Sequence, residues 1–541
     1  MKRLFPILVA VVALWSAACS SGGGTTVLPP PTGKFGLTSL NGTYGFVTAG
    51  EAFVFSGGVT SSLFRTGSFV ANGGGQITGG IEDVVQFSGG QTVQTLGISI
   101  TGGSYTVNAN GTGNITLNVT ANGNPSTVTL GITLTTTSAG LLTDETFNQT
   151  QESTGSGNFF LQNVADCPNP VGSVSGSYVF DFSGVDSSGA PESLVGQFAV
   201  SGGVATSGIT DANDNGVLSS GALGPGSFGT DPQIAAGTNS CGRGLATIGG
   251  QTYEYYVVDA TRIRFISVNT GAALVGDAFA QNAIPTSAAN ISSNLTFIVS
   301  GQTGDGNGFI TRVGRFSTNG STVTNALVDT NDGDAKFTQT TEANPTNASV
   351  TYDPTTGRGT VTFQDHNLAL PFSFVFYLNS ATGGVIQETT SAKNVALGAV
   401  DVADGSLDGQ TGMPFSSSNI TGTYAMNWTG LSQQNSVFDE EDLVGQAKAS
   451  NLTLSGTADI FQFESINGPQ TGNLLNAPIT IGGDGAGDDL HRNTMVVTLT
   501  KNGSNAAINC VVYFVNPQLA FFTSTSSSPT RDIAGALELQ P

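Results

Sequence analysis

One short acidic stretch carries side chains that could bind a metal ion. The segment DANDNG at residues 211–216 matches the first half of the calcium-loop pattern D-x-[DN]-x-[DN]-G. In such a loop Asp211, Asn213 and Asn215 would turn their oxygens toward one hard cation. Position twelve of the loop is Ala222 rather than the required Glu, so a polar hairpin turn is the favoured interpretation.

A second acidic stretch, GGDGAGDD at residues 482–489, is a near match to the glycine–aspartate calcium turns of parallel β-helices. Its candidate oxygens belong to Asp484, Asp488 and Asp489, and Gly487 stands where a further Asp belongs. The sequence therefore favours no cofactor and leaves calcium as the alternative.

The residue sets that common hydrolytic enzymes need are missing. The chain has only two histidines, His366 and His491, and neither an H-E-x-x-H nor a G-x-S-x-G motif. The acidic run Glu440-Glu441-Asp442 is interpreted as a solvated loop, because the two carboxyls of a glycosidase must face one another across a cleft. We therefore predict that the protein is not an enzyme.

The three cysteines after residue 19 have two different expected roles. Cys167 and Cys241 fall within one of the repeats described below, and they could pair in an oxidising compartment, although their spacing alone leaves the pairing open. Cys510 lies inside the apolar run INCVVYF, which predicts a buried free thiol.

Composition points to an all-β protein. The 541 residues include 75 glycines, and only 10% are charged. This composition is poor in helix formers and rich in strand and turn residues. The chain has 16 basic and 38 acidic residues, whereas nucleic acids and anionic membrane surfaces require a basic patch. We therefore expect neither as a partner through charge.

The elements that must position these side chains recur along the chain. An opening phrase such as GTYGF is followed in each unit by a Gly-x-Phe-like motif and an Asp, at intervals far longer than those of solenoid repeats. The repeat-defining residues are Tyr44, Phe69 and Asp83, then Tyr178, Phe198 and Asp211, then Phe297, Phe316 and Asp329, then Tyr424 and Asp459. A Gly-x-Gly turn follows, assigned to residues 111–113, 242–244, 357–359 and 485–487, and each unit closes on a strand that contains Gly157, Gly276, Gly398 or Gly535.

These landmarks predict four tandem domains at residues 37–163, 164–288, 289–408 and 409–541. The first contains eight strand candidates separated by short turns, so chain neighbours should pair as an antiparallel meander. Apolar side chains two residues apart, as in Tyr178, Phe180 and Phe182, place one face of each strand on a core. An eight-stranded up-and-down barrel is the favoured architecture, with a β-sandwich as the alternative.

Residues 1–18 have the organisation of a secretory signal. Two basic residues precede an apolar run, and SAAC at residues 16–19 resembles the lipobox of bacterial lipoproteins. That resemblance implies cleavage before Cys19, its lipidation, and a flexible linker over residues 19–36. It also implies that Ser20 directs the protein to the outer membrane, facing either the periplasm or the outside.

The repeat resembles the barrels of the avidin and lipocalin families in topology alone. The order of its landmarks is similar to uncharacterised tandem β-repeat lipoproteins of Gram-negative bacteria, a resemblance that implies no activity. No polar constellation is evident in every unit, so we expect a structural, adhesive or interaction array of β domains. The alternative is a binding module with a small molecule or glycan inside its barrels, where Trp428 would line a pocket. The oligomeric state is left open, and an envelope or surface macromolecule is the expected partner.

Overall fold

The computed structural model describes most of the chain that follows the predicted tether. The described residues are 35–541 without 55–58, 149–150, 167–169, 232–241, 270, 304–307, 333–337, 343–344, 365–370, 391–399, 414, 435–436, 464–467, 482–491, 502–503 and 526–530. Cys19, Cys167 and Cys241 lie outside them, as do Asp484, Asp488 and Asp489. In the described part of the chain, no helix has the length and apolar character needed to cross a membrane.

The first and last repeats each form a closed antiparallel barrel of eight strands in chain order. Barrel 1 comprises β1 (Asn41–Val54), β2 (Val59–Asn72), β3 (Gln76–Ser88), β4 (Gln91–Val107), β5 (Thr112–Ala121), β6 (Asn124–Leu134), β7 (Ala139–Phe147) and β8 (Gln151–Leu161), after a short 3-10 turn at Leu37–Ser39. Barrel 4 comprises β27 (Gly422–Gln434), β28 (Val437–Ser450), β29 (Thr453–Gln462), β30 (Gln470–Ile481), β31 (Arg492–Lys501), β32 (Ser504–Asn516), β33 (Leu519–Ser524) and β34 (Arg531–Gln540).

The two middle repeats have the same meander with the fourth strand split in two. Barrel 2 comprises α1 (Pro170–Ser173), β9 (Gly176–Val185), β10 (Pro191–Ser201), β11 (Val204–Asp214), β12 (Val217–Ala222), β13 (Gly226–Thr230), β14 (Arg243–Ile248), β15 (Gln251–Asp259), β16 (Arg262–Ser267) and β17 (Ala273–Ala280). Barrel 3 comprises a 3-10 turn (Ala288–Asn290), β18 (Asn294–Gln302), β19 (Phe309–Thr318), β20 (Val323–Asp332), β21 (Thr338–Glu342), β22 (Thr346–Tyr352), β23 (Arg358–Gln364), β24 (Phe372–Leu378), β25 (Gly383–Glu388) and β26 (Val402–Gly409).

Strand pairing confirms the barrel prediction, and the β-sandwich alternative is wrong. In each unit the first strand pairs with the last, as β1 does with β8 and β27 with β34. In barrel 2, β11 pairs with β10 and with both halves of the split strand, β12 and β13. Barrel 3 is nearly closed. Its sheet runs from β21, which pairs with β20, to β22, which pairs with β23, and within the described residues no pairing joins β21 to β22. β26 ends at Gly409, one residue beyond the predicted boundary of the third unit.

The recurring phrases are register partners on neighbouring strands. Tyr44 lies opposite Phe69, and their rings stack with centroids 5.6 Å apart. Tyr178 and Phe198 repeat the pair at the same centroid distance in barrel 2. Cross-strand aromatic pairs stabilise a sheet beyond their burial. The repeated sequence therefore records one aromatic contact shared by barrels 1 and 2, and the equivalent register pairs are Leu295 with Phe316 in barrel 3 and Tyr424 with Ala447 in barrel 4.

One predicted landmark of barrel 3 is wrong. One position of the closing strand holds a glycine in the other three barrels. It lies opposite the residue four positions after the Tyr of the first strand, and the pairs are Gly157 with Thr48, Gly276 with Phe182, and Gly535 with Trp428. In barrel 3 the residue at that position is Gly405, opposite Val299, rather than the predicted Gly398. Gly398 itself lies outside the described residues.

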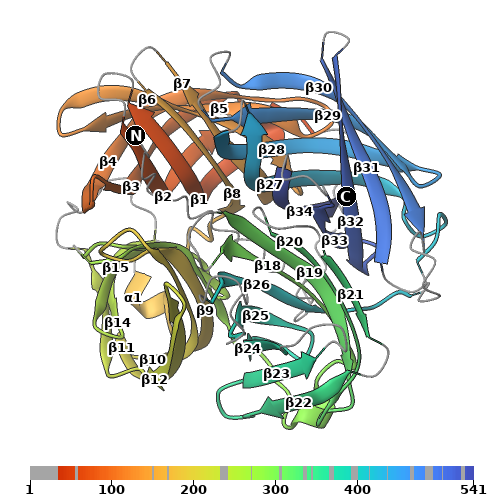
Figure 1. Ribbon diagram of the computed structural model, residues 1–541. Coiled ribbons are helices and arrows are strands. Elements are labelled where there is room, and N and C mark those ends of the chain that lie inside the picture. The colour runs from red at the N-terminus through yellow and green to blue at the C-terminus, as the bar shows by residue number, and fades with distance from the viewer. Residues whose placement is uncertain are drawn as a thin grey trace, which may run out of the picture.

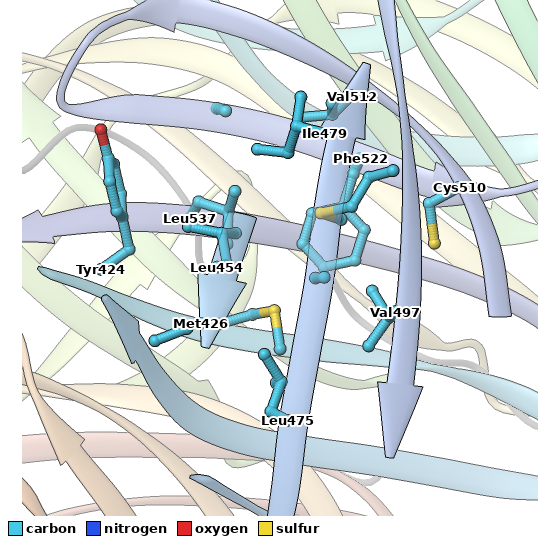
Figure 2. Packing of buried hydrophobic residues seen from close by; sticks show 14 of the residues in the cluster. Tyr424, Met426, Leu454, Leu475, Ile479, Val497, Cys510, Val512, Phe522 and Leu537 are labelled. Atoms are coloured by element: carbon cyan, nitrogen blue, oxygen red, sulfur yellow. The ribbon is translucent and has the colours of Figure 1, made fainter. Parts of the chain in front are cut away.

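The barrel interiors are filled by side chains. Trp428 is fully buried in the core of barrel 4, with its ring 6.4 Å from that of Phe522. Met426, Leu475 and Val497 pack in the same cluster, as Figure 2 shows. Trp428 is therefore a core residue, and the prediction that it lines a pocket is wrong. Cys510 lies in this cluster as a free thiol, which confirms the prediction made for it.

The four barrels form a ring. Figure 1 shows barrels 1 and 4 side by side above barrels 2 and 3. The second strands of barrels 2 and 3, β10 and β19, pack on the last three strands of the next barrel, and β28 of barrel 4 packs on β6, β7 and β8 of barrel 1. In barrel 1, β2 packs on β16 and β17, and β1 packs on β15. We call the interfaces between neighbouring barrels seams, and the interface between barrels 4 and 1 the fourth seam. Since both sides of each barrel are occupied by seams, its paired first and last strands face the ring axis.

Close packing of the first-strand aromatics predicts a sensitive glycine in barrel 1. A Cβ atom at Gly67 would lie 2.7 Å from the ring of Phe46 and 2.5 Å from the carbonyl oxygen of Ile81. We expect Gly67→Ala to lower the free energy of unfolding by about 1–3 kcal/mol, as overpacked cores do. Guanidinium denaturation measures this. Gly221→Ala is the control, because a Cβ at Gly221 meets open space, and an equal loss in both variants would contradict the prediction.

Candidate functional site

The most elaborate polar arrangement lies at the seams. At the first seam Asp83 of barrel 1 accepts two hydrogen bonds of 2.8 Å from the guanidinium of Arg243 in barrel 2. The hydroxyl of Tyr256 donates a third hydrogen bond of 2.6 Å to the same carboxylate. The side chains of Asp83 and Arg243 are completely buried. Charge-assisted bidentate pairs of this kind fix orientation as well as adding energy.

The same arrangement recurs at the next two seams. We call each set of an Asp with an Arg and a Tyr of the following barrel a seam triad. The second triad is Asp211 with Arg358 and Tyr377, and the third is Asp329 with Arg492 and Tyr513. Burial and then the neighbouring Asp83 carboxylate raise the pKa of Tyr256 well above its ordinary value, so its hydroxyl remains a donor.

Local strand structure explains how each triad is presented. Each Arg is the first residue of its strand, and the Tyr is its register partner on the following strand, as for Arg243 and Tyr256. Gly242 precedes Arg243 with φ of +69°, a conformation that favours glycine. The side chains of a directly opposed pair lie on the same face of the sheet. The guanidinium and the phenol therefore point together at the preceding barrel.

A second repeated contact joins all four seams. A Gln at the end of each closing strand, or directly after it, donates to the carbonyl oxygen that follows the Tyr position of the next barrel. The four pairs are Gln162 with Val257, Gln281 with Leu378, Gln410 with Phe514, and Gln540 with Leu134. The last pair joins barrel 4 to barrel 1. We call this contact the glutamine clasp, and its fourfold recurrence shows that the ring is closed by the same rule that joins the barrels along the chain.

Sequence reasoning found only part of these sites. The Asp position of each unit was identified as a landmark, and Arg243 and Arg358 lie within the Gly-x-Gly turns, but the Tyr and Gln partners were missed. In barrel 4 the assignment to residues 485–487 is wrong in register, because the residue equivalent to Arg243 is Arg492. The premise that no polar constellation repeats is also wrong. The signal that could have revealed it is the pairing of Gly-Arg-Gly with a downstream Tyr in successive units.

The fourth seam lacks a triad. Asp459 stands at the equivalent position of barrel 4 and accepts a hydrogen bond from the backbone N–H of Gly472, as Asp83 does from Gly97. The positions of barrel 1 that correspond to Arg and Tyr hold Thr112 and Thr133, which are register partners. Among the described residues, the glutamine clasp therefore occurs at all four seams and the triad at three.

Buried carboxyl groups also gather at the second seam. Asp181 of barrel 2 and Asp404 of barrel 3 are buried and close enough to share a hydrogen bond, which requires one of them to hold a proton. Burial raises the pKa of Asp404 to about 6, and burial with the neighbouring Asp404 raises the pKa of Asp181 further above its ordinary value. The pair is thus a proton-dependent contact between two barrels.

Two buried arginines of β16 connect barrel 2 to barrel 1. Arg264 donates a hydrogen bond of 3.0 Å to the backbone oxygen of Asn158, and it is fully buried. Arg262 lies over the ring of Phe160 with 3.9 Å from its guanidinium carbon to the ring centroid. Burial lowers the pKa of Arg264 to about 10. These cations face the closing strand of barrel 1 and add to the first seam.

The predicted calcium ligands have other roles where the structure describes them. Both carboxylate oxygens of Asp211 bind Arg358, and Asn213 donates 2.8 Å to the backbone oxygen of Asp401 and accepts from Gly216. Asn215 lies in the β11–β12 turn with φ of +48°. Within the described residues, no group of three or more His, Cys, Asp or Glu side chains is placed to hold a metal ion. Calcium near residues 484–489 and the Cys167–Cys241 disulfide stay predictions, since those residues lie outside the described part.

The acidic run of barrel 4 is a correction to the sequence interpretation. Glu440, Glu441 and Asp442 are all fully buried on β28 rather than in a solvated loop. Glu441 is held by Arg531 through two hydrogen bonds of 2.7 and 2.9 Å. The interpretation fails because polar sequence indicates exposure in a lone domain, whereas here barrel 1 covers the face of β28 that carries Glu440 and Asp442, and Arg531 of barrel 4 binds Glu441.

Comparison with known proteins adds no family. No protein-family model and no curated protein matches the chain. Among solved structures, a variant of transferrin binding protein B from Haemophilus parasuis is similar at 10% identity and TM-score 0.20, covering 74% of this chain and 83% of that one. Transferrin binding protein B from serogroup B Neisseria meningitidis is similar at 10% identity and TM-score 0.19, covering 74% and 84%. Likenesses at these scores carry no argument about function.

The contrast between the first and fourth seams predicts unequal effects of one substitution. Asp83→Asn removes the charge opposite Arg243, and we expect the free energy of unfolding to fall by about 3 kcal/mol, as when one partner of a buried ion pair is lost. Asp459→Asn is the matched control, because Asp459 also accepts a glycine N–H but belongs to no triad. We expect Asp459→Asn to lower the free energy of unfolding by no more than about 0.5 kcal/mol in urea denaturation, because the charge that it removes acts on the like-charged Glu145. Equal losses in the two variants would show that the triad adds nothing.

The shared proton at the second seam predicts how stability depends on pH. Because the folded-state pKa of Asp404 is raised, its contribution is fully present below the unfolded pKa of about 4 and is lost as the pH rises to about 6. The free energy of unfolding of the wild type should fall by about 2 kcal/mol between pH 4 and pH 7 because of this group. We expect Asp404→Asn to lack that fall. Parallel pH profiles for the two proteins would refute the assignment.

Proposed function

We propose that this chain is a lipid-anchored cell-envelope protein whose four barrels act as one rigid platform for contacts with macromolecules, and that it is not an enzyme. The observation that carries the proposal is the use of the repeated polar residues. The Asp, Arg, Tyr and Gln sets that recur in the units bind barrels to each other at the seams. The polar residues that recur in the units therefore hold the four barrels together.

The interior of the barrels supports the same assignment. The cluster around Trp428 and Phe522 fills barrel 4, and an aromatic cluster around Phe182 and Phe265 fills barrel 2. A small-molecule or glycan site inside a barrel would need space lined by polar groups that fix the ligand. The packed cores favour contacts on the outer surfaces over the binding-module alternative.

The N-terminal sequence and the charge complete the proposal. Cleavage and lipidation at Cys19 would anchor the ring to the outer membrane through the tether of residues 19–36. The net charge of −22 opposes adsorption to anionic membrane surfaces and nucleic acid. The expected partner is therefore an envelope or surface macromolecule, reached from a lipid anchor rather than through a basic patch.

Anchoring and partner contact can be tested together in the expressing cell. We expect the wild-type protein to sediment with membranes and to form chemical cross-links with an envelope macromolecule, and Cys19→Ala to lose both properties. Cys510→Ala is the control, because Cys510 is a buried free thiol. A Cys19→Ala protein that stays in the membrane fraction would refute the anchor. A wild-type protein that carries a bound small molecule in native mass spectrometry, without cross-links, would refute the platform in favour of the binding module.

A further inference from the structure

Buried carboxyl groups gather at the fourth seam, which has no triad arginine. Glu145 of barrel 1 is almost completely buried, and its Oε1 atom has no hydrogen-bond partner. Its Oε2 atom accepts one long bond of 3.5 Å from Asn114. Asp459 of barrel 4 acts on Glu145 electrostatically and belongs to the Asp position of the repeat. The site that takes an opposite charge in three seams thus meets a like charge in the fourth.

A second group of carboxyls lies on β28 at the same seam. Glu440 and Asp442 are fully buried, and they are close enough for their carboxyl groups to share a hydrogen bond. Thr154 of barrel 1 donates its hydroxyl hydrogen to Asp442, and Glu51 of barrel 1 lies beside Glu440. A hydrogen bond between two carboxyls exists only while one of them is protonated.

Two arginines near this seam are engaged by other carboxylates, and Lys448 is exposed. The other charged or titratable groups on the seam-forming strands are Glu51 on β1, Asp144 on β7, Glu152 on β8, Asp439, Glu441 and Lys448 on β28, Asp459 on β29, and Arg531, Asp532 and Glu538 on β34. Arg531 binds Glu441, and Arg65 of β2 lies 3.3 Å from Asp144. In the described part of the chain no Lys or Arg forms an ion pair with Glu145 or Glu440.

Apolar contact at the fourth seam is also the smallest. Its buried hydrophobic cluster consists of Leu141, Ala425 and Val444, whereas the clusters at the first and third seams, as far as the described residues define them, have nine and twelve members. The remaining contacts are bonds between neutral side chains, such as Asn427 to Ser156 at 3.2 Å, and the glutamine clasp of Gln540. The closure of this seam therefore depends heavily on the state of its carboxyl groups.

We propose that the fourth seam is a proton-operated latch, which is closed while Glu440, Asp442 and Glu145 share or hold protons and opens when they ionise, converting the ring into an open chain of four barrels. Burial and then Asp442 and Glu51 raise the pKa of Glu440 well above its ordinary value. Burial raises the pKa of Asp442 to about 7, and burial with Asp459 raises that of Glu145. These directions place the opening at and above neutral pH.

Opening at this seam leaves the other three closed, because a seam triad holds each of them. The triads pair a carboxylate with an arginine, and ionisation of the carboxylate strengthens rather than weakens such a pair. At the second seam the proton-dependent Asp181–Asp404 contact is lost at high pH, but the bond between Asp211 and Arg358 remains. Opening would expose the packed faces of β28 and of β6, β7 and β8, which lie at the two ends of the chain of barrels. The latch thus controls access to one particular surface.

Hydrogen exchange of the full-length protein tests the latch. Exchange is followed at pH 5.5 and 8.5 in EDTA, with correction for the intrinsic rate at each pH. We expect peptides from β28 and β6 to exchange about tenfold faster at pH 8.5, and peptides from β19 at the third seam to keep their protection. The radius of gyration from X-ray scattering should rise at pH 8.5 as the ring opens.

Two variants distinguish the latch from a general effect of pH. Glu440→Gln should keep the seam protected at pH 8.5, because its amide donates to the Asp442 carboxylate without a shared proton. Glu388→Gln is the control, since Glu388 is a buried carboxyl bound to Arg312 within barrel 3, and it should open like the wild type. Equal protection of β28 at both pH values, or loosening of all seams together, would overturn the proposal. A seam open in EDTA and closed in calcium at both pH values would overturn it in favour of a cation site.

Discussion

The structure depends on how charges are neutralised where two barrels meet. Each barrel buries its own core, but the outer faces of its second strand and of its last three strands are covered by neighbours. A charge in such an interface has lost its water and must find a partner, since the desolvation of an ion is compensated only by close opposite charge and hydrogen bonds. The seam triads meet this requirement with a bidentate arginine and a tyrosine, and the barrels are thereby held in one orientation.

The glutamine clasp has a different physical role. It joins a neutral amide to a backbone carbonyl of the next barrel, and it carries no charge to desolvate. This explains why it recurs at every seam, whereas the triad does not. The clasp sets the relative position of neighbouring barrels, and the triads determine which seams resist separation most strongly.

Much of the fold could be predicted from the sequence, because it rests on local rules. Alternating apolar residues and short turns predict antiparallel strands, and the repeated Tyr and Phe positions are register partners in the barrel cores. The seams could not be predicted in the same way. The partner of Asp83 lies 160 residues away in another barrel, and no local pattern states that two units touch. For the same reason Glu440 was assigned to solvent, because the strand that buries it belongs to barrel 1.

The position of the weakest seam follows from chain connectivity. Three seams join barrels that are neighbours in sequence, so a short connection already holds their partners close together. The fourth joins Gln540 to Leu134, which are 406 residues apart, and it must offset the entropy of closing the whole ring. Strong charge pairing at that seam would make the ring permanent once it formed. Carboxyl groups without a triad arginine leave closure conditional on protonation, and they place the most adjustable interface where the chain itself offers no restraint.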